Sequence, residues 1–216
     1  MHVAVVDPAV HTPELDAFNR MSRRSRLPLT YHLPALVGLD DLERVEDGLA
    51  GIVVFGSGAS AQDDPPWARE LRRWLERWLD RVPVLGLCYG HQILAQILGG
   101  EVGFVTPDRR KLVGRREVAL EADRLWGEAR RVPLLISHRE MVTRLPDDCV
   151  VLGASDDCAV DAFGHRTLPI WGFQPHPEAT PGFARNNDVP VDGPDEVWAY
   201  GHALVDAFLD WVADGR

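Results

Sequence analysis

Cysteine is scarce in this chain of 216 residues, which has only Cys88, Cys149 and Cys158. No two of them are spaced as CxxC, so the sequence disfavours a structural zinc site, and we expect no metal and no other cofactor. Three thiols are also too few for a disulfide framework. Because the first residues lack the basic and apolar parts of a signal peptide, we expect a cytoplasmic protein with reduced cysteines.

Long apolar runs and excess positive charge are also missing. No apolar stretch approaches the ~20 residues that a membrane-spanning helix needs, so a membrane is not an expected partner. The formal net charge is −10, whereas a nucleic-acid-binding protein normally presents a basic face. The short basic patches at 23–26 and 109–111 are more typical of a solvated surface, so nucleic acid is not expected as a partner either.

The remaining composition is that of a globular protein, with 45% hydrophobic and 26% charged residues. Short apolar runs predict buried strands, and the spacing of apolar residues predicts helices between them. The predicted fold is an α/β sandwich with a mainly parallel central sheet and some shorter antiparallel strands, in a single domain spanning 1–216. The expected strands are 3–7, 51–55, 82–87 and 168–173, the antiparallel strands 111–120, 149–155 and 158–163, the helices 67–80, 89–98 and 195–212, and a surface loop 175–194.

The segment VLGLCYGHQ, residues 84–92, has the layout of a nucleophile elbow. Its strand-to-helix turn is so tight that the residues two positions from the nucleophile must be small, and Gly86 and Gly90 meet this need. The turn would lift Cys88 above the carboxyl edge of the sheet. There the helix N-terminus favours a thiolate, and the N–H of Tyr89 can face a developing oxyanion.

A lone cysteine is more often a small buried residue than a nucleophile, so a partner base is needed. His176 is followed two residues later by Glu178, and in an extended backbone both side chains would point to one side. The chain order Cys88, His176, Glu178 therefore predicts a nucleophile, a base and an orienting acid. His91 lies on the helix of the elbow and is expected to point elsewhere, and His138 is a candidate for substrate contact rather than the base. The remaining histidines lack such an acid and are expected to be structural or exposed: His2, His11, His32, His165 and His202.

The motifs GLCYGHQILAQILGG (86–100) and GFQPHPEAT (172–180) together resemble the class I glutamine amidotransferase family. The resemblance extends over nearly the whole chain through VAVVD, VVFGSGAS and SHRE, and is similar to the glutaminase part of GMP synthetase. It implies a flavodoxin-like, three-layer α/β fold with a smaller antiparallel sheet. It also implies glutamine as the substrate and a separate synthetase or acceptor protein that receives ammonia.

By this resemblance, Cys88 attacks the side-chain amide of glutamine and His176 protonates the leaving ammonia. The γ-glutamyl thioester that results is then hydrolysed to glutamate. The other residues to which the resemblance gives a role are the backbone of Ser57, Gly58 and Tyr89 for the oxyanion, and Gly56, Gln92, Ser137 and His138 for the substrate.

Three positions depart from the family pattern. Gly56-Ser57-Gly58 stands where relatives often carry two glycines and a proline. Arg139 replaces a glycine in the common Ser-His-Gly-Asp, which puts bulk and charge beside the pocket. Pro175 stands where an aromatic residue is common before the histidine.

Three alternatives stay open. Residues 56–61 read as G-x-G-x-x-A, a dinucleotide fingerprint, although the acids at 63 and 64 would repel phosphate. The same Cys and His chemistry serves γ-glutamyl hydrolases, which need no acceptor. A non-catalytic binding or regulatory protein is the third alternative, which the complete set of Cys88, His176 and Glu178 disfavours.

Overall fold

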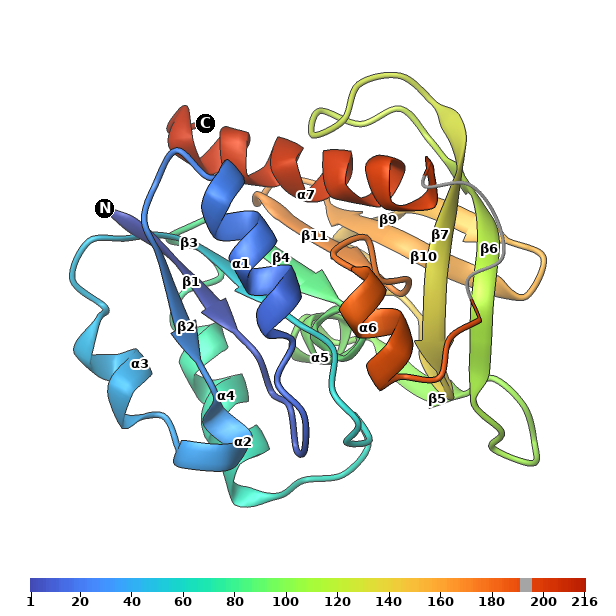
Figure 1. The fold of residues 1–216 in the computed structure, drawn as a ribbon, viewed down its shortest axis with the longest axis horizontal. Helices are drawn as coiled ribbons and strands as arrows, with labels where there is room; N and C mark the ends of the chain where they lie inside the picture. Colours follow the sequence, from blue (N-terminus) through green and yellow to red (C-terminus); the bar gives the residue numbers. More distant parts are fainter. Residues whose placement is uncertain (191–195) are drawn as a thin grey trace.

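The computed structural model describes residues 1–190 and 196–216, whose core is a sheet with the order β2-β1-β3-β4-β11-β10-β9-β6-β7 (Figure 1). Five strands of one half run parallel: β2 (Leu29–His32), β1 (His2–Val6), β3 (Leu49–Val54), β4 (Val84–Leu87) and β11 (Ile170–Phe173). The other half is antiparallel: β10 (Cys158–His165), β9 (Cys149–Ser155), β6 (Leu112–Leu120) and β7 (Arg130–His138). A separate antiparallel pair joins β5 (Glu101–Phe104) to β8 (Glu140–Arg144).

Helices cover both faces of the sheet because its parallel strands are apolar on both sides. Val3 and Val5 pack with α1 (Leu15–Arg24) and α7 (Glu196–Ala213) in one apolar cluster. Ala4 and Val6 belong to a second cluster, on the opposite face. That cluster includes side chains of α3 (Asp40–Arg44), α4 (Pro66–Glu76) and α5 (Tyr89–Ile97), and the short helices α2 (Pro34–Val37) and α6 (Pro181–Asn186) complete the described elements. The predicted three-layer α/β sandwich with a smaller antiparallel sheet is confirmed.

Some details of the predicted elements differ. The expected antiparallel strands continue the main sheet, and the separate small sheet is the β5–β8 pair, which the sequence did not predict. Helix α6 lies within the expected surface loop 175–194 because Thr180 caps it, accepting a hydrogen bond of 3.2 Å from the N–H of Phe183. Residues 191–194 of that loop and Asp195, the first residue of the expected last helix, lie outside the described residues.

The parallel half positions the functional site. The carboxyl ends of β1, β3, β4 and β11 meet at one edge, where a doubly wound sheet places its ligands. The residues that directly follow these strands are Asp7, Phe55, Cys88 and Gln174. The end of β7 joins the same region, since the N–H of His176 donates to the carbonyl of Leu135 at 2.8 Å.

Candidate active site

Cys88 sits at the sharp turn between β4 and α5. Its φ of 50° and ψ of −101° lie in a region that side chains other than glycine rarely occupy. A backbone of this kind costs about 1–3 kcal/mol and is held by its surroundings. Here the N–H of Cys88 donates to Phe173 at 2.7 Å, and its carbonyl accepts from Gln92 at 3.0 Å. The predicted elbow is therefore present in the backbone.

The two flanking glycines are required by close backbone approach. A Cβ at Gly86 would lie 2.6 Å from the carbonyl carbon of Gly90, and a Cβ at Gly90 would overlap the carbonyl oxygen of Val54. Neither neighbour is the far end of a flexible side chain. Strand β3, the turn and the start of α5 are packed too tightly here for any larger residue, which agrees with the spacing in the sequence.

His176 and Glu178 are both buried and joined by a hydrogen bond. The Nδ1 of His176 lies 2.8 Å from the Oε1 of Glu178. The backbone between them is a turn rather than the expected extended segment, closed by a 3.1 Å bond from the N–H of Ala179 to the carbonyl of His176. The ring of Phe183 packs against the imidazole at 4.3 Å between centroids, so α6 helps to fix the ring.

Electrostatics in this cluster favour a charged imidazole. Burial by itself would lower the pKa of His176, but the negative charges of Cys88 and Glu178 outweigh burial and raise that pKa. The Nδ1 carries the bond to Glu178, and the buried Nε2 has no hydrogen-bond partner among the described residues. An imidazolium here can therefore stabilise a thiolate at Cys88 and can donate a proton from Nε2.

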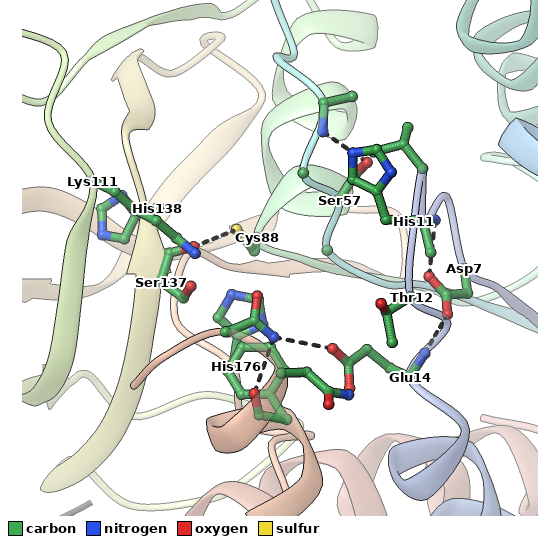
Figure 2. A pocket seen from close by; sticks show the side chains of 18 of the residues that line it. Asp7, His11, Thr12, Glu14, Ser57, Cys88, Lys111, Ser137, His138 and His176 are labelled. Carbon is green, nitrogen blue, oxygen red and sulfur yellow. Dashed lines mark hydrogen bonds between the residues drawn. The ribbon is translucent and has the colours of Figure 1, made fainter. Parts of the chain in front are cut away.

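A cavity of about 200 Å³ connects these groups (Figure 2). The Sγ of Cys88 lies 4.0 Å from the carbonyl oxygen of Ser137 and 3.7 Å from the Nε2 of Gln174. Gly56 closes the wall opposite, because a Cβ at that position would lie 2.8 Å from the Cε1 of His176 and 3.5 Å from the Cβ of Cys88. The cavity is lined by Gly56, Ser57, Gly58, Cys88, Gln92, Ser137, His138, His176 and Glu178, all of which the sequence predicted for the site.

The loop after β3, predicted to help bind the oxyanion, is held from two sides. The hydroxyl of Ser57 donates to Pro8 at 2.6 Å and accepts from the N–H of Ala59 at 3.0 Å. The buried carboxylate of Glu140 accepts a hydrogen bond of 2.8 Å from the N–H of Ala61. It also accepts hydrogen bonds from the side chains of Ser60 and Gln62. A carboxylate already occupies this loop, which disfavours the dinucleotide alternative because phosphate would be repelled.

Tyr89 and Gln92 lie on the helix that follows the elbow. Tyr89 is the first residue of α5, so its N–H has no acceptor within the helix, although its side chain is buried away from the cavity. The Nε2 of Gln92 donates to the carbonyl of Glu140 at 2.8 Å and to the Oε1 of Gln174 at 3.1 Å. His91, as expected, points elsewhere, and its buried ring packs on Phe163.

Ser137 and His138 end strand β7 at the cavity. The hydroxyl of Ser137 is buried and has no hydrogen-bond partner among the described residues, so it is available to a ligand. Both ring nitrogens of His138 are already engaged, Nδ1 with the carbonyl of Glu140 at 2.9 Å and Nε2 with Arg116 at 3.2 Å. Since arginine can only donate, Nε2 accepts, and burial together with the Arg116 charge lowers the pKa of His138 to about 4.

The sequence did not predict the acidic wall formed by the loop between β1 and α1. Asp7 accepts hydrogen bonds from the N–H groups of Ala9 and Glu14 and from the hydroxyl of Tyr31, so it shapes the loop. Glu14 faces the cavity, and burial raises its pKa to about 7. A polar residue at the end of the first strand was a usable signal for Asp7, whereas nothing in the local pattern pointed to Glu14. His11, which we expected outside the site, also lines the cavity.

The other two thiols are inert by comparison. Cys149 and Cys158 are buried and unpaired, and burial raises their pKa to about 11 and about 12. Across residues 1–190 and 196–216, no group of three or more His, Cys, Asp or Glu could hold a metal ion. The helices within those ranges include none long and apolar enough to cross a membrane.

A cysteine on a backbone elbow, beside a buried histidine–carboxylate pair at the carboxyl edge of a parallel sheet, is typical of α/β enzymes whose thiol attacks a carbonyl carbon. The chain belongs to the class I glutamine amidotransferase family, whose model matches residues 30–188. This confirms the resemblance that the two sequence motifs carried, and it makes the chain a glutamine amidotransferase domain.

Relatives agree with this assignment. The chain is 35% identical over 140 residues, 64% of this chain and 71% of the relative, to the glutamine-hydrolyzing GMP synthase component of Methanopyrus kandleri. It is 36% identical over 146 residues, 68% of this chain and 74% of the relative, to the corresponding component of Pyrococcus furiosus. A glutamine amidotransferase of Thermotoga maritima has the same fold, with a TM-score of 0.75, 17% identity and 99% of both chains covered.

Proposed function

We propose that this chain hydrolyses glutamine through a Cys88–His176–Glu178 triad and supplies ammonia to a separate synthetase. The observation that carries the proposal is the placement of a backbone-strained cysteine and a buried, unpartnered imidazole nitrogen on one cavity. The two GMP synthase relatives are each named as one subunit of that enzyme, which supports a division of labour between chains. Three unpaired thiols favour a cytoplasmic location.

The reaction would begin with attack of the Cys88 thiolate on the side-chain carbonyl carbon of glutamine. The carbonyl oxygen becomes an oxyanion, which the N–H of Tyr89 and the backbone at Ser57 and Gly58 would stabilise. The Nε2 of His176 then protonates the leaving nitrogen, so the C–N bond breaks and ammonia departs, leaving a γ-glutamyl thioester. Glu178 would hold the imidazole in the productive tautomer.

Water would complete the cycle. The neutral His176 accepts a proton from water as its oxygen attacks the thioester carbon. The C–S bond breaks, glutamate leaves, and the thiolate and imidazolium are restored. Gln92 borders the substrate, and Ser137, whose hydroxyl has no partner among the described residues, would bind its amino-acid end. His138 would support the wall of the site without bonding the substrate through its ring, because both ring nitrogens already have hydrogen-bond partners.

The experiment that tests this function compares the wild type with Cys88→Ala for release of glutamate and ammonia from glutamine. We expect the variant to lose detectable turnover, and equal rates would overturn the proposal. Because a glutaminase without its synthetase can be nearly silent, the same proteins are treated with a glutamine-like chloroketone. Fast, selective alkylation of Cys88 supports the nucleophile, and an ordinary thiol rate favours a non-catalytic protein.

A γ-glutamyl hydrolase would use the same residues, so the substrate must be varied in the same assay. If γ-glutamyl conjugates of larger amines are hydrolysed much faster than glutamine, the hydrolase alternative is correct. A preference for glutamine supports the amidotransferase assignment.

A further inference from the structure

Two cations, Lys111 and Arg139, lie at one wall of the cavity. Strands β6 and β7 pair as far as Leu112 opposite His138, and Lys111 and Arg139 are the residues immediately beyond that last pair on the two strands. Both residues are exposed at the mouth of the cavity, and an anion bound there would be attracted by both charges.

Lys111 is directed at the reactive sulfur. In Figure 2 its side chain extends past His138 toward Ser137 and Cys88. Burial is the main cause of a lowered pKa for Lys111, the Arg139 charge adds to it, and the Cys88 and Asp188 charges oppose it. Neither Lys111 nor Arg139 forms an ion pair with a carboxylate in the part of the chain that the structure describes.

A neutral donor lies beside these cations. Ser137 is only 8% exposed, and its buried hydroxyl has no hydrogen-bond partner in the described ranges. The carboxylate of the nearby Glu140 is hydrogen-bonded to Ser60, Ala61 and Gln62 and forms no ion pair with either cation in the described ranges. One ammonium, one guanidinium and one hydroxyl are together a donor set for a carboxylate.

We propose that Lys111, with Arg139 and Ser137, binds the α-carboxylate of the γ-glutamyl substrate and thereby determines specificity for it. The inference rests on the proposed function, since it assigns one end of the substrate of that same site. It also explains the departure at Arg139, where bulk and charge replace the glycine that relatives often carry. Lys111 would hold the substrate through a charge-assisted hydrogen bond, with Arg139 adding charge at the rim.

The test uses three amides: glutamine, glutaramate, which lacks the amino group, and 4-aminobutanamide, which lacks the carboxylate. We expect Lys111→Met to raise KM about tenfold for glutamine and glutaramate, with kcat little changed, because one charge-assisted bond is lost. For 4-aminobutanamide the variant should match the wild type. Lys111→Arg should restore most of the affinity, and Arg110→Met, which removes the neighbouring exposed cation, should behave as the wild type.

Two outcomes separate the inference from the function. If the wild type hydrolyses glutamine and Lys111→Met keeps the same KM, the inference is overturned and the proposed function stands. If the wild type proves silent, the rates at which Cys88 reacts with a glutamine-like chloroketone and with its counterpart lacking the carboxylate are compared instead. A preference for the carboxylated reagent that Lys111→Met abolishes supports the inference, and equal preference in both proteins overturns it.

Discussion

His176 and Glu178 meet across a turn, with their Nδ1 and Oε1 atoms 2.8 Å apart and both side chains almost entirely removed from water. This hydrogen bond occupies Nδ1, and Nε2 has no hydrogen-bond partner among the described residues. In such an arrangement the carboxylate fixes the tautomer and supports the positive charge of the ring. A variant that removes the charge of Glu178 can therefore show whether this residue acts through His176 or only stabilises the fold.

Glu178→Gln keeps the size of the side chain and removes its charge. We expect kcat for glutamine to fall at least a hundredfold, in the range of roughly 10²–10⁴ that general acid–base catalysis contributes, with a much smaller change in KM. Because the Glu178 charge helps to raise the pKa of His176, the alkaline limb of the rate profile should also move to lower pH. Steady-state rates across pH provide the measurement.

The matched control for this prediction is Glu117→Gln, which removes an exposed carboxylate on β6. It should leave both the rate and the pH profile unchanged. An unchanged profile for Glu178→Gln, or an equal effect of the two variants, would show that the carboxylate does not act through His176.

The backbone strain at Cys88 gives a stability prediction. Alanine at this position keeps a Cβ at φ 50°, whereas glycine tolerates it, so Cys88→Gly should be more stable than Cys88→Ala by about 1 kcal/mol after the entropic cost of glycine. Urea unfolding of both variants measures the difference. At Cys149, in β9, the order should be reversed because a glycine weakens a regular strand. If glycine were the less stable residue at both sites, the elbow would hold no strain.

The elbow was predictable because its constraint is local. A tight strand-to-helix turn leaves its mark within five residues, in Gly86 and Gly90, and the buried parallel strands leave theirs in short apolar runs. The sequence also predicted that Cys88, His176 and Glu178 would line one cavity, but not the turn at Pro177 and Glu178, because two prolines are compatible with either backbone.

Features that depend on distant contacts could not be predicted. Strands β5 and β8 carry mixed residues and exist through their pairing with each other, and the lining role of Glu14 depends on the loop that Asp7 organises. Lys111 reaches the site only through the register of β6 on β7, which no short motif encodes. In each case the missing information was which segments become neighbours.

Glu14 provides a prediction about pH and stability. Burial raises its pKa to about 7 from an ordinary 4.5, so between these values the folded protein retains a proton that the unfolded chain loses. The free energy of unfolding of the wild type should therefore fall relative to Glu14→Gln as pH rises through this window, and level off above it. Urea unfolding at several pH values on both sides of the window measures this difference.

Glu70→Gln, an exposed substitution on α4, is the control and should give no such pH-dependent difference. Other buried acids contribute equally to the wild type and to Glu14→Gln, so they cancel in the comparison. A constant difference between these two proteins across the window would contradict a raised pKa for Glu14.

The unequal surroundings of the three sulfurs have a practical consequence. Cys149 and Cys158 hold their protons far above neutral pH, and only Cys88 opens onto the cavity. A modest excess of electrophile added briefly to the native protein should mark one atom per molecule. The fraction of competent enzyme in any preparation can thus be counted by mass spectrometry before a substrate or a partner protein has been identified.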